Sequence, residues 1–370
     1  MKVLIVGAGM AGLALANTLD KNKFQITLID KAPEFKTIGF AVSIWSKGVS
    51  ILEQLNIYHK ILDKIKIINN DVLFDKNSNY ITSVDFNYLK LSYPMMVIAR
   101  ADLHQALSKD IKDKLDLRMD TFIKNINNTD SGCYVSFSGL NQKEEFFDLV
   151  VGADGIKSSI RNSIFKDEAL IKMPYKIWSF WINKSNDNVL TMLDKGILSI
   201  EYPAGDKGVI TAVAPISIAG NTKHDRIKNA FINFPDMIKS KIENIKENEI
   251  FEDGMYYVNL KSFLNKRVIL IGDAAHAFSP ILGMGTTLAI EDGYNLGEKM
   301  NSIIDSKHIE AILSEYNNNR VNYINDFRRI VLITEKIYLA NNIFIKTFRD
   351  MYVKIFGIHL FEIFMSKYLK

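Results

Sequence analysis

The chain has 370 residues, 48% hydrophobic and 24% charged, which is the composition of an ordinary globular protein. This length exceeds one typical domain, so we expect two domains of mixed structure. The formal net charge of +4 is small and argues against a nucleic-acid-binding protein, in which basic residues gather in a patch or stripe. The single cysteine, Cys133, excludes an internal disulfide and favours the reducing cytoplasm, and its alternating neighbours predict a packed strand residue.

The beginning of the chain predicts a fold rather than a targeting segment. Met1 and Lys2 lead directly into an apolar strand at 3–6 and a glycine turn, without the apolar segment and cleavage site of a signal peptide. No apolar run reaches the roughly 18 residues needed to cross a bilayer, so no transmembrane segment is expected.

The first motif is a glycine-rich turn between a strand and a helix. The turn Gly7-x-Gly9-x-x-Gly12 follows the strand, opens a small-residue helix and is followed by a second strand at 24–30. Its glycines permit a tight turn, close approach of a pyrophosphate and close packing of helix on strand. An acid at the end of the second strand can accept hydrogen bonds from an adenosine ribose. The predicted dinucleotide contacts are Gly7, Gly9, Met10, Ala11, Gly12 and Asp30.

The second motif follows a run of short strands. The patterns at 65–91 and 121–147 predict antiparallel strands on either side of a helix at 101–107. A short buried strand at 149–152 then leads into the turn Asp154-Gly155 and a helix with Ser158 or Ser159 near its cap. The turn is consistent with a cofactor contact by Asp154 or with a helix cap alone.

Residues 171–257 are rich in strand patterns, with one helix-like stretch at 227–245, and form the best candidate for a separate sheet domain. Trp178 and Trp181 lie where this domain begins. They are candidates for lining an aromatic substrate pocket, although tryptophans in sheets are more often part of the core.

The third motif begins where a buried strand at 267–271 delivers Asp273 to its carboxyl end, the edge at which open α/β sheets bind ligands. Pro280 ends the following loop, and glycines in the turn after it allow the backbone to lie against a flat ring. A helix starting near Thr286 would direct its N–H groups at that ring and stabilise negative charge there. The predicted contacts are Asp273, Pro280, Gly283, Met284 and Gly285.

Together the three motifs resemble the class A flavoprotein monooxygenases, the family of para-hydroxybenzoate hydroxylase and the tetracycline-inactivating monooxygenases. The resemblance implies that the first motif binds the ADP half of FAD, that Asp154 serves FAD and the nicotinamide cofactor, and that Asp273 binds the ribitol. The family places an arginine before a helix between the first two motifs, which Arg100 matches, and a basic residue after the ribose acid, which Lys31 matches. Thr287 stands where many members have Asn, so no flavin contact is assigned to it. His276 is expected to pack or to form a hydrogen bond.

The predicted fold class is α/β: a discontinuous Rossmann-type FAD-binding domain, an inserted antiparallel sheet domain for the substrate, and C-terminal helices. We expect the FAD-binding domain to comprise 1–70, 96–170 and 258–315. The substrate domain would comprise 71–95 and 171–257, and the helices of 316–370 would bridge the two. These helices carry many basic and apolar residues, for which packing across the domains is favoured over a membrane surface.

The resemblance implies an NAD(P)H-dependent monooxygenase that uses O₂ to hydroxylate a small aromatic or polyketide-like molecule through a C4a-hydroperoxyflavin. No residue is predicted to act as a catalytic acid or base, because the flavin carries the chemistry. A tetracycline-like substrate would imply a role in antibiotic resistance. NADPH and NADH are both open, and the oligomeric state is not predicted. The histidines lack metal-ligand spacing, so no metal site is expected.

Three alternatives remain at this point. A flavin-dependent halogenase would share the first motif, but Trp178-Ser179-Phe180-Trp181-Ile182-Asn183 does not match the motif Trp-x-Trp-x-Ile-Pro. An FAD-dependent reductase would need no O₂. A non-enzymatic scaffold with the same fold would be colourless, or would hold a flavin that cannot be reduced.

Overall fold

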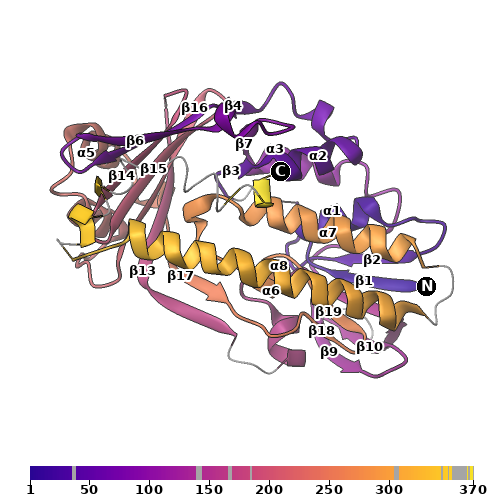
Figure 1. Ribbon diagram of the computed structural model, residues 1–370. Helices are drawn as coiled ribbons and strands as arrows, with labels where there is room; N and C mark the ends of the chain where they lie inside the picture. The colour runs from indigo at the N-terminus through magenta and orange to yellow at the C-terminus, as the bar shows by residue number, and fades with distance from the viewer. Residues whose placement is uncertain are drawn as a thin grey trace.

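The computed structural model describes residues 1–35, 39–138, 144–165, 169–183, 186–303 and 308–342, together with 345–348, 350, 351, 365 and 367–369. Two large sheets lie at opposite ends of the molecule, and the long helix α8 runs past both of them (Figure 1). Among the described residues, no helix combines the length and the apolar character that crossing a bilayer requires.

The first large sheet has six strands in the order β18-β19-β12-β1-β2-β8. The strands from β19 to β8 are parallel, so their carboxyl ends meet at one edge, where Val6 pairs with Gly152 and Ile29. This edge therefore brings the glycine turn, the Asp154 turn and the Asp273 loop together, although they are far apart in sequence. The strands are β1 (Lys2–Val6), β2 (Gln25–Ile29), β8 (Asp116–Arg118), β12 (Leu149–Gly152), β18 (Leu264–Asn265) and β19 (Val268–Leu270).

Helices cover this sheet, and the closest pair is α1 (Met10–Thr18) with α7 (Gly285–Asn301). The two backbones approach so closely that a Cβ at Gly293 would lie 2.3 Å from the Ala11 carbonyl oxygen. This contact explains why both helices carry small residues where they meet. The neighbouring helices are α2 (Ser46–Gln54), α3 (Arg100–Ser108) and the short α6 (Asp273–His276).

The second large sheet has seven strands in the order β17-β13-β16-β15-β14-β5-β6. Its pairs are antiparallel except for β14 with β5, which are parallel. Two segments far apart in the sequence thus form one sheet. The strands are β5 (Asn70–Asp75), β6 (Tyr80–Asp85), β13 (Leu170–Ile182), β14 (Val189–Asp194), β15 (Ile197–Ala204), β16 (Lys207–Pro215) and β17 (Phe251–Val258).

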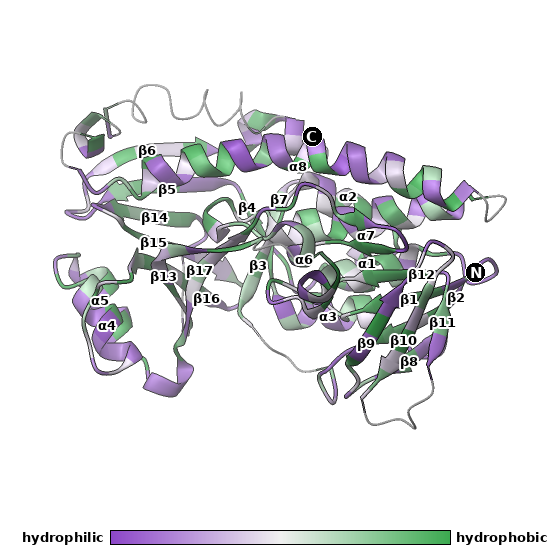
Figure 2. Cartoon of the chain, turned by 90° about the horizontal axis from the view of Figure 1, so that it is seen from below, coloured by the Kyte–Doolittle hydropathy of each residue, from purple (hydrophilic) through white to green (hydrophobic). Residues whose placement is uncertain are grey.

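One face of the second sheet packs on two helices, α4 (Lys223–Ala230) and α5 (Asp236–Glu243), which lie together on one side of it (Figure 2). The sequence predicted one helical stretch at 227–245. Pro235 divides it because proline fixes its φ and lacks the N–H that a continuous helix needs, and α5 begins directly after it.

Two small sheets and short turns complete the fold. Cys133 is a fully buried strand residue, as predicted, and burial raises the pKa of its thiol to about 12. The small sheets join β3 (Ala41–Ile44), β7 (Met95–Ala99) and β4 (Lys66–Ile68), and β11 (Glu145–Phe147), β10 (Cys133–Phe137) and β9 (Ile123–Asn128). The short turns are Tyr58–Lys60, Phe86–Leu89, Glu247–Glu249 and Pro280–Leu282, with a π-helical turn at Arg161–Phe165.

Helix α8 (Ile309–Tyr338) has 30 residues and runs through the predicted boundary at 315. It packs on α7 and β18 at one end, and Leu339, directly after it, packs with the second sheet at the other (Figures 1 and 2). The helix therefore contacts both large sheets. Much of the predicted helical region beyond it, including 352–364, lies outside the described residues.

Candidate active site

One cavity of about 380 Å³ extends from the carboxyl edge of the six-stranded sheet to the face of the second sheet that is turned away from α4 and α5. Its volume is in the range of small-molecule sites. From the first sheet and its loops it is lined by Gly9, Met10, Ala11, Arg100, Ala153, Gly155, Ile271, Asp273, Pro280, Gly283, Gly285, Thr286 and Ala289. From the second sheet it is lined by Asp71, Val189, Thr191, Ile200, Tyr202 and Thr211.

The three glycines of the first turn have different structural roles. Gly7 has φ +107°, and a Cβ there would lie 2.4 Å from the Ala153 oxygen; a Cβ at Gly12 would lie 2.0 Å from the Gly7 oxygen. At Gly9, however, the nearest atom to an added Cβ is the Ala153 oxygen, 4.0 Å away. Gly7 and Gly12 therefore permit the turn itself, whereas Gly9 leaves space at the start of α1, where no side chain caps the helix and an anion can bind.

Asp30, directly after β2, holds this turn through hydrogen bonds. Its carboxylate accepts hydrogen bonds from the backbone N–H groups of Ala8 and Ala32, both at 2.8 Å. On the other side of the turn, His104 Nε2 donates to the Ala8 carbonyl at 2.8 Å, and burial lowers the pKa of this histidine. The sequence did not identify His104. Neither Asp30 nor the exposed Lys31 lines the cavity, so their contacts with the nucleotide stay predictions.

The Asp154 carboxylate is hydrogen-bonded to the start of the helical turn that begins at Ser159. Its Oδ1 accepts from Ser158 Oγ at 2.5 Å, and its Oδ2 accepts from the Ser159 backbone N–H at 2.7 Å and from Ser159 Oγ at 2.9 Å. The neighbours Ala153 and Gly155 line the cavity, but Asp154 does not. This arrangement favours the structural interpretation of the turn, and a contact of the Asp154 carboxylate with the cofactor stays a prediction.

Replacing Asp154 by alanine is therefore expected to lower the free energy of unfolding by about 0.5–2 kcal/mol, the usual effect of losing a cap. Affinity for FAD should be unchanged, because the carboxylate makes its contacts within the turn. Denaturant unfolding and a fluorescence titration with FAD measure the two quantities, and Ser158→Ala, which removes one of the same bonds, is the matched control. A selective loss of FAD affinity at unchanged stability would support the cofactor assignment instead.

The Asp273 loop places a carboxylate in the cavity, and Arg100 at the start of α3 places a guanidinium there. Gly272, with φ +61°, turns the chain after β19, and Asp273 is accessible from the cavity although protein surrounds it. Burial raises the pKa of Asp273, and the nearby positive charges of His276 and Arg100 partly offset this effect. Asp273 and Arg100 can thus hydrogen-bond to hydroxyl or carbonyl groups of a bound cofactor from the same end of the cavity.

A buried network behind this loop was not identified from the sequence. His276 Nε2 donates to Asp292 Oδ2 at 2.6 Å, which confirms the hydrogen-bonding role predicted for His276, and the Gly272 N–H donates to the same oxygen at 2.6 Å. Arg320 on α8 pairs with Asp292 and also with Glu291 at 3.0 Å. Burial disfavours the charged form of Asp292, but Arg320 and His276 outweigh it and hold its pKa at about 2. The network fixes the start of the Asp273 loop to α7 and α8.

The turn before α7 differs in part from the prediction. Gly283 has φ +60°, and a Cβ there would lie 2.3 Å from Ser43 Oγ, so this glycine is required by the turn. Met284 is buried in the core and does not line the cavity. Among the described residues, and apart from its chain neighbours and its own helix backbone, no atom lies within 4 Å of a Cβ added at Gly285. Its φ is not positive either, so its backbone conformation does not demand glycine. Thr287 is buried and accepts a hydrogen bond from the Trp45 N–H at 3.0 Å, a structural role.

The open space at Gly285 belongs to the cavity, next to the uncapped start of α7. Gly285→Val should fold normally but displace a ring bound against this helix end. We expect reduction of the bound flavin by NADPH to slow by up to about 100-fold, because small misplacements of reacting groups have effects of this size. Stopped-flow reduction, normalised to bound FAD, measures it. An unchanged rate would mean that Gly285 only begins a helix.

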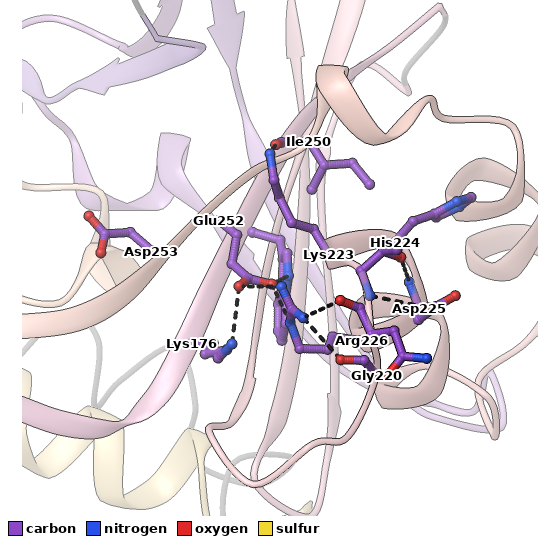
Figure 3. Close-up of polar contacts among 12 residues, drawn as sticks. Lys176, Gly220, Lys223, His224, Asp225, Arg226, Ile250, Glu252 and Asp253 are labelled. Carbon is purple, nitrogen blue, oxygen red and sulfur yellow. Dashed lines mark hydrogen bonds and ion pairs between the residues drawn. The ribbon is translucent and has the colours of Figure 1, made fainter.

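The two tryptophans lie on opposite faces of the second sheet, because side chains alternate along β13 and 178 and 181 differ by an odd number. Trp178 is fully buried against α4 and α5, and its Nε1 donates to Glu252 at 2.7 Å. Figure 3 shows Glu252 between Lys176 and Arg226, which pair with it at 3.0 and 2.9 Å. The predicted pocket role of Trp178 is therefore wrong. Trp181 lies on the other face, 6.0 Å from the Phe40 ring, but does not line the cavity.

Comparison with known proteins identifies the family. The sequence profile described as the FAD binding domain matches residues 1–229 and 235–329. The chain belongs to this FAD-binding family. Aurachin C monooxygenase/isomerase of Stigmatella aurantiaca is 24% identical over 341 residues, which cover 88% of this chain and 87% of that protein.

Two solved structures share the fold. Klebsiella pneumoniae HpxO, complexed with FAD and uric acid, has a TM-score of 0.89 at 18% identity, covering 100% of this chain and 96% of HpxO. Tetracycline destructase Tet(55) has a TM-score of 0.76 at 23% identity, covering 100% and 97%. The predicted fold class, the FAD cofactor and the assignment to the group A flavin-dependent monooxygenases are confirmed.

Proposed function

We propose that this flavoprotein uses NADPH or NADH to reduce its FAD and transfers one oxygen atom of O₂ to a small aromatic or polyketide-like molecule. The observation that carries the proposal is the continuous cavity, which joins the Gly9 turn and the Asp273 loop to a wall of the second sheet. The ring of a flavin and that of an organic substrate can therefore lie in contact within one cavity.

The residues of the cavity fit FAD. The start of α1 at Gly9 would hold the pyrophosphate, Asp273 and Arg100 would hold polar groups of the flavin half, and the start of α7 at Gly285 would face the ring. When bound, the flavin supplies hydride acceptance from the nicotinamide and activation of O₂. The chain itself binds and orients the two molecules, and apolar side chains such as Ile200 and Val189 exclude water from the sheet wall.

The alternatives predict other outcomes. A reductase would reduce its substrate without consuming O₂, a halogenase would require halide, and a scaffold would not turn over. The monooxygenase is favoured because curated relatives along most of the chain are named as monooxygenases. The cytoplasmic location predicted from the single cysteine is part of this proposal.

A steady-state screen tests the function. The FAD-loaded protein is incubated with NADPH or NADH, O₂ and a panel of phenols, N-heteroaromatics and polyketides, and products are identified by mass spectrometry. We expect at least one compound to gain one oxygen atom and to accelerate oxidation of the nicotinamide. Flavin reduction without any oxygenated product across the panel would contradict the proposal.

A further inference from the structure

A polar patch on the second sheet forms the wall of the cavity opposite the flavin motifs. It consists of Asp71 on β5, Thr191 on β14, Tyr202 on β15 and Thr211 on β16. Thr191 pairs with Ile200, and Ile200 pairs with Thr211, so these neighbours share one face of the sheet. The residues of the patch come from four strands, and therefore no local sequence motif predicts it.

The hydroxyl groups of the patch leave Asp71 with capacity for another partner. Thr191 Oγ1 donates to Asp71 Oδ1 at 2.8 Å, whereas the Tyr202 hydroxyl and Thr211 Oγ1 bond to each other at 3.2 Å. From the described part of the chain, the second carboxyl oxygen of Asp71 receives no hydrogen bond and the carboxyl forms no ion pair. Burial raises the pKa of Asp71 to about 7, so it can take up or release a proton near neutrality.

The charges around the cavity define what it can recognise. Among its described lining residues Arg100 is the single cation, and it lies near Asp273 at the flavin end. The polar residues that line the cavity with Asp71 from β14, β15, β16 and α8 are uncharged at neutral pH: Thr191, Tyr202, Thr211 and Tyr338. The strand neighbours of Asp71 are also uncharged, Val84 on β6 and Val189 on β14. An aromatic carboxylate would therefore meet no positive partner at the sheet wall, whereas a neutral hydrogen-bond donor would find an acceptor.

We propose that Asp71 contacts the substrate and accepts the proton of a hydroxyl or ring N–H group on a neutral aromatic molecule. This inference rests on the proposed monooxygenase function. The substrate O–H or N–H bond breaks, the proton bonds to the free carboxylate oxygen, and the electron pair stays on the substrate. The ring thereby becomes richer in electrons, which favours attack on an electrophilic oxygen. No electrons are exchanged in this step, and the proton passes back to the product or to solvent afterwards.

The test compares Asp71→Asn with wild type and with Asp75→Asn, which makes the same change on the same strand outside the cavity. Substrates are neutral phenols and N-heteroaromatics, each paired with its O- or N-methylated form and with a ring carboxylic acid. We expect wild type and Asp75→Asn to oxygenate the neutral donors selectively, with kcat/KM rising through about pH 7. Asp71→Asn should lower kcat/KM by about 10²–10⁴-fold and lose this rise, while reduction of FAD without substrate stays unchanged.

Folding of the variant is checked separately. The folded-state pKa of Asp71 lies above its ordinary value, so wild type should lose stability as pH rises from about 4 to about 7. Asp71→Asn should lack this loss and melt at a higher temperature than wild type above pH 7. The inference fails if Asp71→Asn keeps the wild-type pH profile and rate, or if methylated compounds react equally well. If wild type oxygenates nothing, the proposed function itself fails, and the inference falls with it.

Discussion

A Gly9→Val variant is expected to fold and to lose its FAD. The backbone of Gly9 is extended, with φ −79° and ψ −172°, which valine adopts readily, and the nearest atom to the new Cβ is 4.0 Å away. The side chain would instead fill the space at the start of α1 where the pyrophosphate is expected to lie. We expect FAD to bind at least about 100-fold more weakly, which corresponds to about 2.8 kcal/mol.

The neighbouring glycines provide the contrast. Gly12→Ala places a Cβ 2.0 Å from the Gly7 oxygen and should reduce the stability of the apoprotein itself. Gly9→Ala, with one methyl group, should weaken FAD binding less than Gly9→Val does. Titration of the apoproteins with FAD and urea unfolding separate the two effects. If folded Gly9→Val bound FAD as tightly as wild type, the pyrophosphate could not lie at this turn.

The second large effect is expected from Arg320→Met, which should lower the free energy of unfolding by about 3–5 kcal/mol at neutral pH. Arg320 is buried and pairs with both Asp292 and Glu291, so its loss removes the guanidinium that balances two buried carboxylates and leaves His276 as the remaining basic partner of Asp292. Since the pair with Asp292 also orients the Asp273 loop, FAD affinity should fall together with stability.

The pH dependence identifies the cause. The folded-state pKa of Asp292, about 2, lies below its ordinary value of about 3.9, so its contribution to stability is present above about pH 4 and is lost as pH falls toward 2. Without Arg320 this pKa should rise, and the deficit of the variant should shrink in acid. The control is Arg329→Met on the same helix, an exposed arginine whose loss should cost less than about 1 kcal/mol. Equal effects of the two substitutions would contradict a special role of the network.

The parts of the site that could be predicted from sequence are those formed by local patterns. A buried strand followed by a glycine turn and a helix requires particular residues at fixed spacing, and this pattern in its strand–turn–helix context makes Gly9 and Asp273 candidates for the site. The parallel order of β1, β12 and β19 then brings these motifs to one edge. The resemblance of the motifs to a family supplied the cofactor.

The rest depends on contacts between distant segments. Asp71 and Thr191 meet because β5 and β14 pair in parallel, and Arg320 reaches Asp292 because α8 lies along α7. Neither contact leaves a periodic signal in the sequence. The error at Trp178 has a simpler source: the side chains of β13 alternate between the two faces of the sheet, and one tryptophan had to face α4 and α5.

The most direct test of the central claim is a single-turnover reaction with isotopically labelled O₂. The purified protein is loaded with FAD, reduced anaerobically with NADPH or NADH, and mixed with labelled O₂ and a compound that the screen identified. The account predicts one labelled oxygen atom in the product for each reduced flavin consumed, with little hydrogen peroxide. Reoxidation that yields only hydrogen peroxide, or a product whose new oxygen comes from water, would contradict it.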